Sequence, residues 1–298
     1  MMDWTEDKIA VAKELVIDGK TSWSIAQIVS DKWGEPITKY MIDNLRSRYG
    51  LAHLLGGADG IPIYQELSLP TDNYMISCDY HAPYYSKLWV NRMFAVAQKM
   101  GVKKHIIVGD LFDMDFAKWQ KRNDGEEEPT IDQEQEWSSP LIEALDYFDE
   151  IYCIAGNHET RLGRITDARI QFKHIVQYFT APLGDKFKFS EYDKLRIGDD
   201  WLVVHPKSYS QVSGSVVIRL AEKFHRHILN AHGHFIALRF DRSGKYMGVD
   251  LGGMFNQEKI AYTSLKTTSH PFWNCGFGMI YGGYFHHFHS GTDWSIWT

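Results

Sequence analysis

Several apolar stretches of the sequence end in side chains that can bind a metal ion. The most distinctive is the run Tyr-Cys-Ile-Ala at residues 152–155, which is followed by Gly-Asn-His-Glu at 156–159 and then by Arg161. An apolar run of this kind predicts a buried strand, and Gly-Asn predicts a turn at its end. In an open α/β sheet the carboxyl ends of the strands border one crevice. We therefore expect the polar side chains that follow such strands to gather there.

Four further runs have the same form. Residues 74–78 lead to Asp79 and His81, residues 105–108 to Asp110, residues 201–204 to His205, and residues 227–231 to His232 and His234. Together with Asn157, these positions supply carboxylate and amide oxygens, which suit ions such as Mn²⁺, and imidazoles, which also suit Zn and Fe. No cysteine belongs to the set, which argues against a structural zinc site of the cysteine type.

The order of these motifs resembles that of the calcineurin-like metallophosphoesterase family. Its pattern is Asp-x-His, Gly-Asp, Gly-Asn-His-(Asp/Glu), a single His, and Gly-His-x-His. The resemblance covers about residues 73–235, and five short motifs in the right order make it specific. One position departs from the pattern, because Ala231 stands where the family usually has Gly. The two histidines that follow keep their spacing, so we retain both.

The resemblance implies hydrolysis of a phosphoester with two divalent metal ions. It assigns Asp79, His81, Asp110 and His234 to one ion, and Asp110, Asn157, His205 and His232 to the other. The carboxylate of Asp110 would be shared between them. His158 would be the general acid, since an imidazole can carry a proton near neutral pH. Manganese is the first metal expected, with iron, zinc and nickel as alternatives.

The residues around the third motif bear on the substrate. Arg161 could bind a phosphate through two parallel hydrogen bonds, and a salt bridge to a nearby acid is equally open. Protein phosphatases of the family usually have Asp-Arg-Gly after Gly-Asp, whereas this chain has Asp113 and Met114. The missing arginine favours a phosphodiesterase or nuclease. A phosphomonoesterase acting on a nucleotide or phosphoprotein is the runner-up. A DNA-binding or assembly protein with a degenerate metal site is the alternative from another class.

Residues 1–50 predict a small unit of three helices. Thr21 or Ser22 can cap the second helix, and the third covers about residues 38–49. The second and third resemble a helix-turn-helix DNA-binding unit, whose last helix enters the major groove. The polar face of that helix offers Lys39, Tyr40, Asn44, Arg46 and Arg48. The unit has seven basic and eight acidic side chains, a poor balance for gripping DNA, so an adaptor or dimerisation role stays open.

The order of the expected elements predicts an α/β fold. After a glycine-rich linker at residues 51–71, a strand, a helix at about 86–99 and a second strand form a β-α-β unit. Strand patterns dominate after about residue 187, and Asp-Arg-Ser-Gly at 241–244 predicts a hairpin. The family resemblance implies that residues 72–298 form a sandwich of two sheets flanked by helices.

The composition is that of an ordinary globular protein. The 298 residues are 44% hydrophobic and 23% charged, and the net charge of −6 argues against a broad electrostatic grip on nucleic acid. No apolar run is long enough to span a membrane, the first residues lack the pattern of a secretory signal, and three separated cysteines suit reduced thiols. We therefore expect a cytoplasmic protein without a membrane partner. Nucleic acid is the expected partner, and a homodimer stays open.

Overall fold

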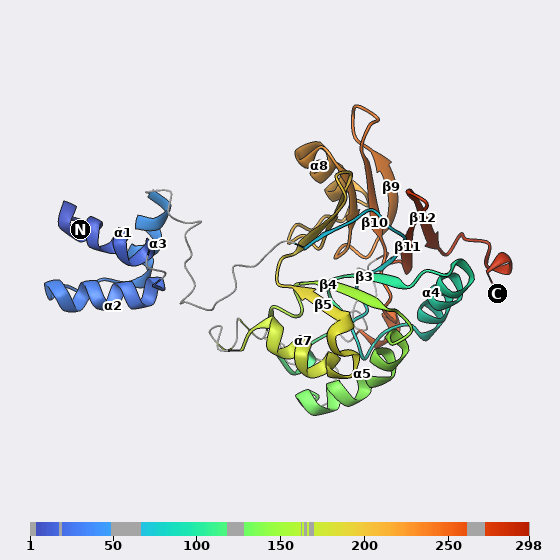
Figure 1. Cartoon of the computed structure of the whole chain (residues 1–298), viewed down its shortest axis with the longest axis horizontal. Coiled ribbons are helices and arrows are strands. Elements are labelled where there is room, and N and C mark those ends of the chain that lie inside the picture. Colours follow the sequence, from blue (N-terminus) through green and yellow to red (C-terminus); the bar gives the residue numbers. More distant parts are fainter. Residues whose placement is uncertain are drawn as a thin grey trace. The chain divides into compact units, whose positions relative to one another are not determined.

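The computed structural model describes residues 4–17, 20–48, 67–117, 128–161, 163, 166, 170–260 and 272–297. The chain divides into two compact units, Met1–Gln65 and Glu66–Thr298 (Figure 1). Within the described ranges, no helix is both long and apolar enough to cross a membrane.

The first unit contains three helices around a small apolar core. They are α1 (Glu6–Ile17), α2 (Ser22–Trp33) and α3 (Lys39–Arg48). The hydroxyl of Thr21 accepts a hydrogen bond from the Ser24 N–H at 3.1 Å, and Gly34 ends α2 with φ of 66°. The buried core consists of Ala12, Val16, Ile25, Ala26, Val29, Ile37, Ile42 and Leu45. All of them except Ile37, which precedes α3, lie on the helices at helical spacing, so the amphipathic pattern accounts for the unit.

The second unit contains two mixed sheets of six strands each. In spatial order, the first sheet holds β1 (Leu67–Leu69), β6 (Lys194–Ile197), β7 (Trp201–Val204), β8 (His227–Asn230), β10 (Met247–Leu251) and β9 (Ile236–Phe240). The second holds β12 (Tyr284–His289), β11 (Gly276–Tyr281), β2 (Tyr74–Ser77), β3 (Lys104–Val108), β4 (Glu150–Ile154) and β5 (Phe187–Ser190). This arrangement confirms the expected two-sheet α/β sandwich. The expected hairpin at residues 241–244 joins β9 to β10.

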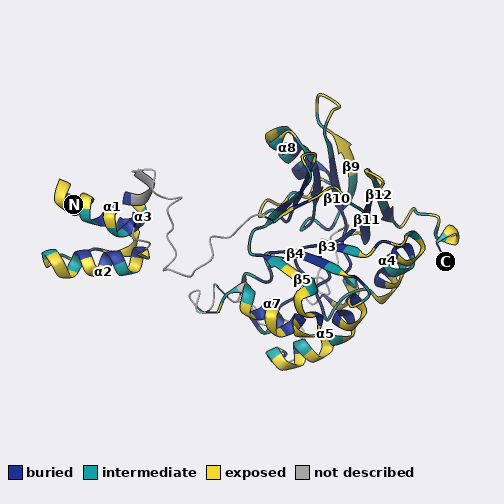
Figure 2. Cartoon of the chain, in the orientation of Figure 1, coloured by how far each residue is buried: buried dark blue, intermediate teal, exposed yellow. Residues whose placement is uncertain are grey.

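Helices cover the outer faces of both sheets. They are α4 (Lys87–Met100), α5 (Ile131–Leu145) and α7 (Phe172–Thr180) on the second sheet, and α8 (Ser215–Phe224) on the first (Figure 1). Strand β2 shows how the layers form, because Tyr74 and Ile76 enter the core between the sheets while Met75 packs with the helices. Such strands are buried on both faces (Figure 2). This explains why they read as continuous apolar runs rather than as alternating ones.

The second unit includes residues that precede the expected start at residue 72. Strand β1 lies within the segment 51–71 and pairs in parallel with β6, so that Leu67 lies opposite Leu195. Three residues are too few to show a period in the sequence, and the pairing partner alone makes them a strand. Residues 51–66 of the expected linker lie outside the described ranges.

A buried histidine lies near the amino end of β3. The Nε2 atom of His105, in β3, is 2.7 Å from the Ser77 hydroxyl oxygen, and the ring packs against Phe148. Burial favours the neutral imidazole and lowers the pKa of His105 to about 3. In the unfolded chain a histidine takes up its proton at about pH 6.5. The neutral ring therefore contributes stability above pH 6.5, and this contribution is lost as the pH falls toward 3.

Replacing this histidine should flatten the acid dependence of stability. Between pH 7 and pH 5, we expect the free energy of unfolding to fall by roughly 2 kcal/mol more in the wild type than in His105→Gln. Glutamine can still bond to Ser77 but does not titrate. Urea denaturation at both pH values measures the difference. The same acid dependence in the two proteins would show that His105 is not the responsible group.

Candidate metal centre

The sheet topology brings the metal-binding motifs together. Strands β2, β3 and β4 are parallel, so the segments that begin at Asp79, Asp110 and Asn157 leave the same edge of the second sheet. Strands β7 and β8 are parallel in the first sheet, and they deliver His205 and His232 in the same way. The seven ligands expected from the sequence all lie within this one region, linked by the contacts described below.

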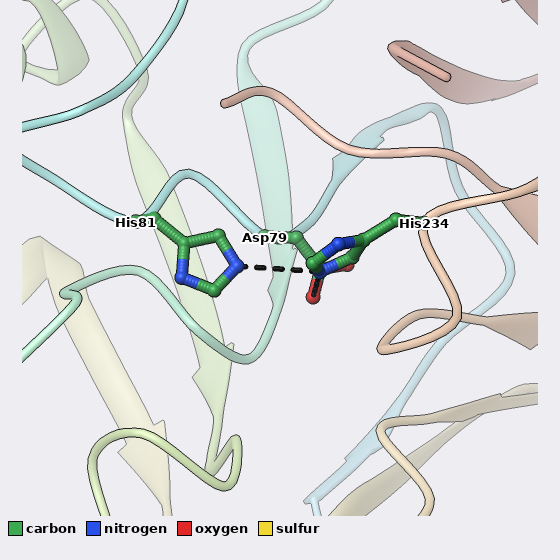
Figure 3. Close-up of side chains that lie close together, drawn as sticks. All are labelled: Asp79, His81 and His234. Carbon is green, nitrogen blue, oxygen red and sulfur yellow. Dashed lines mark hydrogen bonds and ion pairs between the residues drawn. The ribbon is translucent and has the colours of Figure 1, made fainter. Parts of the chain in front are cut away.

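One cluster consists of Asp79, His81 and His234, whose ligand atoms all lie within 4.8 Å of one another. The Nε2 atom of His234 is 3.2 Å from Asp79 Oδ1 and 3.3 Å from His81 Nε2. Figure 3 shows these three side chains turned toward one another. All three are buried. The cluster corresponds to the ligands expected for one metal ion, apart from the shared Asp110.

A second cluster consists of Asp110, His205 and His232. The Nε2 atom of His205 lies 3.4 Å from Asp110 Oδ2 and 3.1 Å from Asn157 Oδ1. The two clusters adjoin, since the backbone N–H of His232 donates to the carboxylate of Asp79 at 3.2 Å. These residues correspond to the ligands expected for the other ion.

The donor chemistry around His205 fits a bound cation. Its Nδ1 lies 2.8 Å from the carbonyl oxygen of Val108, which can only accept a hydrogen bond, so Nδ1 carries the proton. The Nε2 lone pair then faces oxygens of Asp110 and Asn157, which are acceptors as well. Burial disfavours the charged imidazole, yet Asp110 outweighs burial and raises the pKa of His205 to about 10. Positive charge is therefore favourable between His205 Nε2 and the oxygens of Asp110 and Asn157, and a divalent ion would supply it.

The backbone at the ligands adopts a rare conformation. Positive φ angles occur at Asp79 (51°), His81 (48°), Asp110 (48°), His232 (71°) and His234 (57°). Residues other than glycine seldom adopt this region, and each such conformation costs on the order of 1 kcal/mol or more. Because five of the seven expected ligands share it, the left-handed turn is the local means by which these strand ends direct side chains inward.

Two glycines let the loops approach closely. A Cβ atom on Gly109 would lie 2.5 Å from His205 Nδ1, and one on Gly156 would lie 2.8 Å from the Cγ of Asp110. A larger residue in place of either motif glycine would therefore clash with His205 or Asp110. At the remaining position, Ala231 replaces the usual glycine and packs in the core between the sheets.

Asp113 orients two histidines, a role that the sequence analysis did not assign. Its Oδ1 is 2.9 Å from His81 Nδ1 and 3.0 Å from His158 Nδ1, and its side chain is fully buried. A carboxylate on Nδ1 fixes the ring and leaves Nε2 directed at the site. The only signal in the sequence was its place three residues after Asp110.

Glu159 connects two of the motif loops, and the sequence analysis gave it no role either. Its carboxylate accepts hydrogen bonds from the backbone N–H groups of Gly156, Asp110 and Phe112 at 3.0–3.1 Å. Burial and then the charge of Asp110 raise the pKa of Glu159 to about 7. The side chain thus joins the Gly-Asp loop to the Gly-Asn-His loop from below the ligands.

His158 and Arg161 form a pair beside the clusters. The backbone N–H of His158 donates to Asp110 Oδ1 at 2.9 Å, and its Nε2 is 3.9 Å from Asp110 Oδ2. The Arg161 guanidinium lies 2.6 Å from that Nε2 and also donates to the backbone carbonyl of Asp113 at 2.7 Å. Arg161 is therefore held against the expected general acid.

The residues expected to bind nucleic acid lie on α3 of the first unit. Tyr40 is 72% exposed and Asn44, one turn later, is exposed on the same face. Lys39 forms an ion pair with Asp43 at 2.7 Å, which offsets its charge. The side chains of Arg46 and Arg48 lie outside the described residues. DNA binding by this unit stays a prediction.

Comparisons with known proteins agree with the motif order. The model of the calcineurin-like phosphoesterase family matches residues 79–274. A search of curated protein sequences found no match. Among solved structures, Yfce, a phosphoesterase from E. coli, is 11% identical over 71% of this chain and 89% of its own, with a TM-score of 0.37. Vacuolar Protein Sorting 29 from Cryptosporidium parvum is 14% identical over 74% and 96%, also with a TM-score of 0.37. Likenesses this distant carry no functional argument.

The close approach at Gly156 can be tested by adding one methyl group. We expect Gly156→Ala to displace the carboxylate of Asp110 and to lower the metal bound per chain by about tenfold or more at limiting metal. Gly233→Ala is the matched control, because among the described residues, its two chain neighbours aside, the Cβ would come within 4 Å of Phe235 alone, at 3.5 Å. Metal content after dialysis measures both, with circular dichroism as the check on folding. Equal retention in a folded Gly156→Ala protein would rule out the steric argument.

Proposed function

The chain belongs to the calcineurin-like phosphoesterase family, and on that premise we propose that it is a metal-dependent phosphodiesterase that cleaves nucleic acid. The observation that carries the proposal is the pair of adjoining ligand clusters, Asp79–His81–His234 and Asp110–His205–His232. Bound divalent ions would supply Lewis acidity that offsets the charge developing on the phosphate. Manganese is the first ion to test, with iron, zinc and nickel as alternatives that suit the same donors.

His158 is proposed as the general acid. Asp113 and the backbone hold its Nδ1 side, so that Nε2 is the atom that meets the leaving oxygen. In the structure Nε2 accepts from Arg161. A substrate phosphate would compete for the guanidinium, which would release Nε2 to carry a proton and donate it. Arg161 would then bind a phosphate oxygen.

The charge of residues 111–117, which follow Asp110, favours a diester substrate over a monoester. A monoester carries one more negative charge than a diester near neutral pH, and it needs an additional cation. Residues 111–117 contain no Lys or Arg, and Met114, where phosphatases of the family have Arg, is fully buried. Arg161 is the observation that favours the runner-up, a phosphomonoesterase. The intact set of ligand types argues against a degenerate site.

The choice between the two reactions can be measured with chromogenic substrates. With Mn²⁺, we expect a larger kcat/KM for bis-p-nitrophenyl phosphate than for p-nitrophenyl phosphate. Asp110→Asn and His158→Ala should each lower turnover by about a hundredfold or more, but only Asp110→Asn should also lose metal. Preference for the monoester would support the phosphomonoesterase instead. Equal metal loss in both variants would contradict the role given to His158.

We also propose that the first unit binds duplex DNA through α3. Its three helices, with α3 exposing Tyr40 and Asn44 on one face, support this. In the full-length protein, Tyr40→Ala together with Asn44→Ala should weaken duplex binding about tenfold, by the loss of groove contacts. Glu14→Ala, an exposed substitution on α1, is the control. Fluorescence anisotropy at fixed salt measures the affinity, and an unchanged affinity would make the unit an interaction module for another partner.

A further inference from the structure

Exposed apolar side chains of the second unit adjoin the metal-binding segments. Tyr209 and Val212 follow the ligand His205, and Leu238 and Phe240 follow the ligand His234 in the chain; Phe272 lies in a segment bonded to His234. Single exposed apolar residues are ordinary on protein surfaces. Here, however, two aromatic side chains of these segments, Tyr209 and Trp273, also lie against the rings of expected ligands, which points to a substrate with an apolar part.

Tyr209 lies beside the cluster that contains Asp110. Its ring centroid is 6.2 Å from that of His232, and the two planes are nearly perpendicular, at 78°. Half of the tyrosine is exposed to solvent. A half-exposed aromatic ring next to an expected metal ligand could receive a flat group attached to a phosphate held at the metal.

Phe272 and Trp273 lie beside the other cluster. The backbone N–H of Asn274 donates to the carbonyl of His234 at 2.8 Å, which fixes this segment to the site. The Trp273 ring centroid is 4.5 Å from that of His234 and 5.6 Å from that of Phe255. Phe272 itself is 88% exposed. Each cluster therefore has an aromatic neighbour of its own.

The structure has one aromatic position beside each ligand cluster, and a diester has two substituents. We propose that Tyr209 and the Phe272–Trp273 pair are stacking platforms for unpaired nucleobases on either side of the scissile phosphate. The substrate class is then a single-stranded nucleic acid or a dinucleotide, because the bases of a duplex already stack on one another. The inference rests on the phosphodiesterase function proposed above.

The electrostatics of the chain agree with stacking as the source of affinity. A net charge of −6 provides little general attraction for a polyanion. Stacking of bases on aromatic rings does not depend on a positive net charge. One base stacked on one aromatic side chain strengthens binding by about 5- to 150-fold. Trp294, by contrast, is engaged in packing, because it lies against Trp89 and Phe277 with the Arg92 guanidinium 4.3 Å from its centroid.

Abasic strands separate stacking from phosphate binding. The full-length protein with Mn²⁺ would be given a single-stranded oligonucleotide and the same backbone with tetrahydrofuran in place of each nucleoside. We expect kcat/KM to be at least about tenfold higher for the strand with bases. Tyr209→Ala and Phe272→Ala should each remove about fivefold or more of this advantage without affecting the abasic strand. Tyr209→Phe, which keeps the ring, should retain it.

Tyr284→Ala is the matched control. Tyr284 is 75% exposed and lies at the hairpin between β11 and β12. This end of β11 pairs with the amino end of β2, through Ile280 and Tyr74, whereas the expected ligands follow the carboxyl end of β2. Anisotropy of labelled phosphorothioate strands, with and without bases, gives affinities independent of turnover, and the same pattern is expected there.

The outcomes distinguish the two proposals. Cleavage of both strands at equal rates, with the variants unchanged, would overturn the stacking platforms and leave the phosphodiesterase standing. Cleavage of neither strand, with activity on a phosphomonoester, would remove the proposed function and the platforms with it. An equal loss in Tyr209→Ala and Tyr284→Ala would show that the effect is not local to the site, and would also overturn the platforms.

Discussion

The structure of the site depends on the hydrogen bonds of Asp110. Its backbone N–H donates to Glu159, its carbonyl accepts from the His81 N–H, and its carboxylate accepts from the His158 N–H while lying close to His205. One residue thus links its own motif to three others, those that contain His81, His158 with Glu159, and His205. Because Asp110 is almost fully buried, burial raises the cost of its charge, and the surrounding histidines offset that cost and lower the pKa well below its usual range.

This concentration of polar groups explains the form of the surrounding fold. Buried carboxylates are stable only when donors or cations surround them, and here the donors come from loops at the ends of parallel strands. Those loops must turn within one or two residues to face inward. The left-handed conformations at Asp79 and His81, and the glycines at 109 and 156, are the consequence. The apolar core between the sheets holds them in place despite the local cost.

The same arrangement organises the proposed chemistry. One carboxylate, that of Asp113, lies against both the expected metal ligand His81 and the proposed general acid His158. Arg161 lies on the Nε2 side of His158, where a bound phosphate would compete for the guanidinium. Binding of the substrate and release of the acid would therefore be coupled. Aromatic side chains at Tyr209 and Trp273 would extend recognition from the phosphate to the groups attached to it.

Local pattern determined much of this protein. The apolar runs identified the strands, and the caps and glycines bounded the helices. The residue types after each strand, read with the family resemblance, indicated seven expected ligands, which the structure brings together. Tertiary structure alone decided that β1 joins the first sheet, that Asp113 binds two histidines and that Glu159 joins two loops. The reason is distance along the chain. A periodic apolar pattern or a helix cap involves only a few neighbouring residues. Asp79 and His234 are 155 residues apart in the chain, and only the packing of the two sheets brings such groups together.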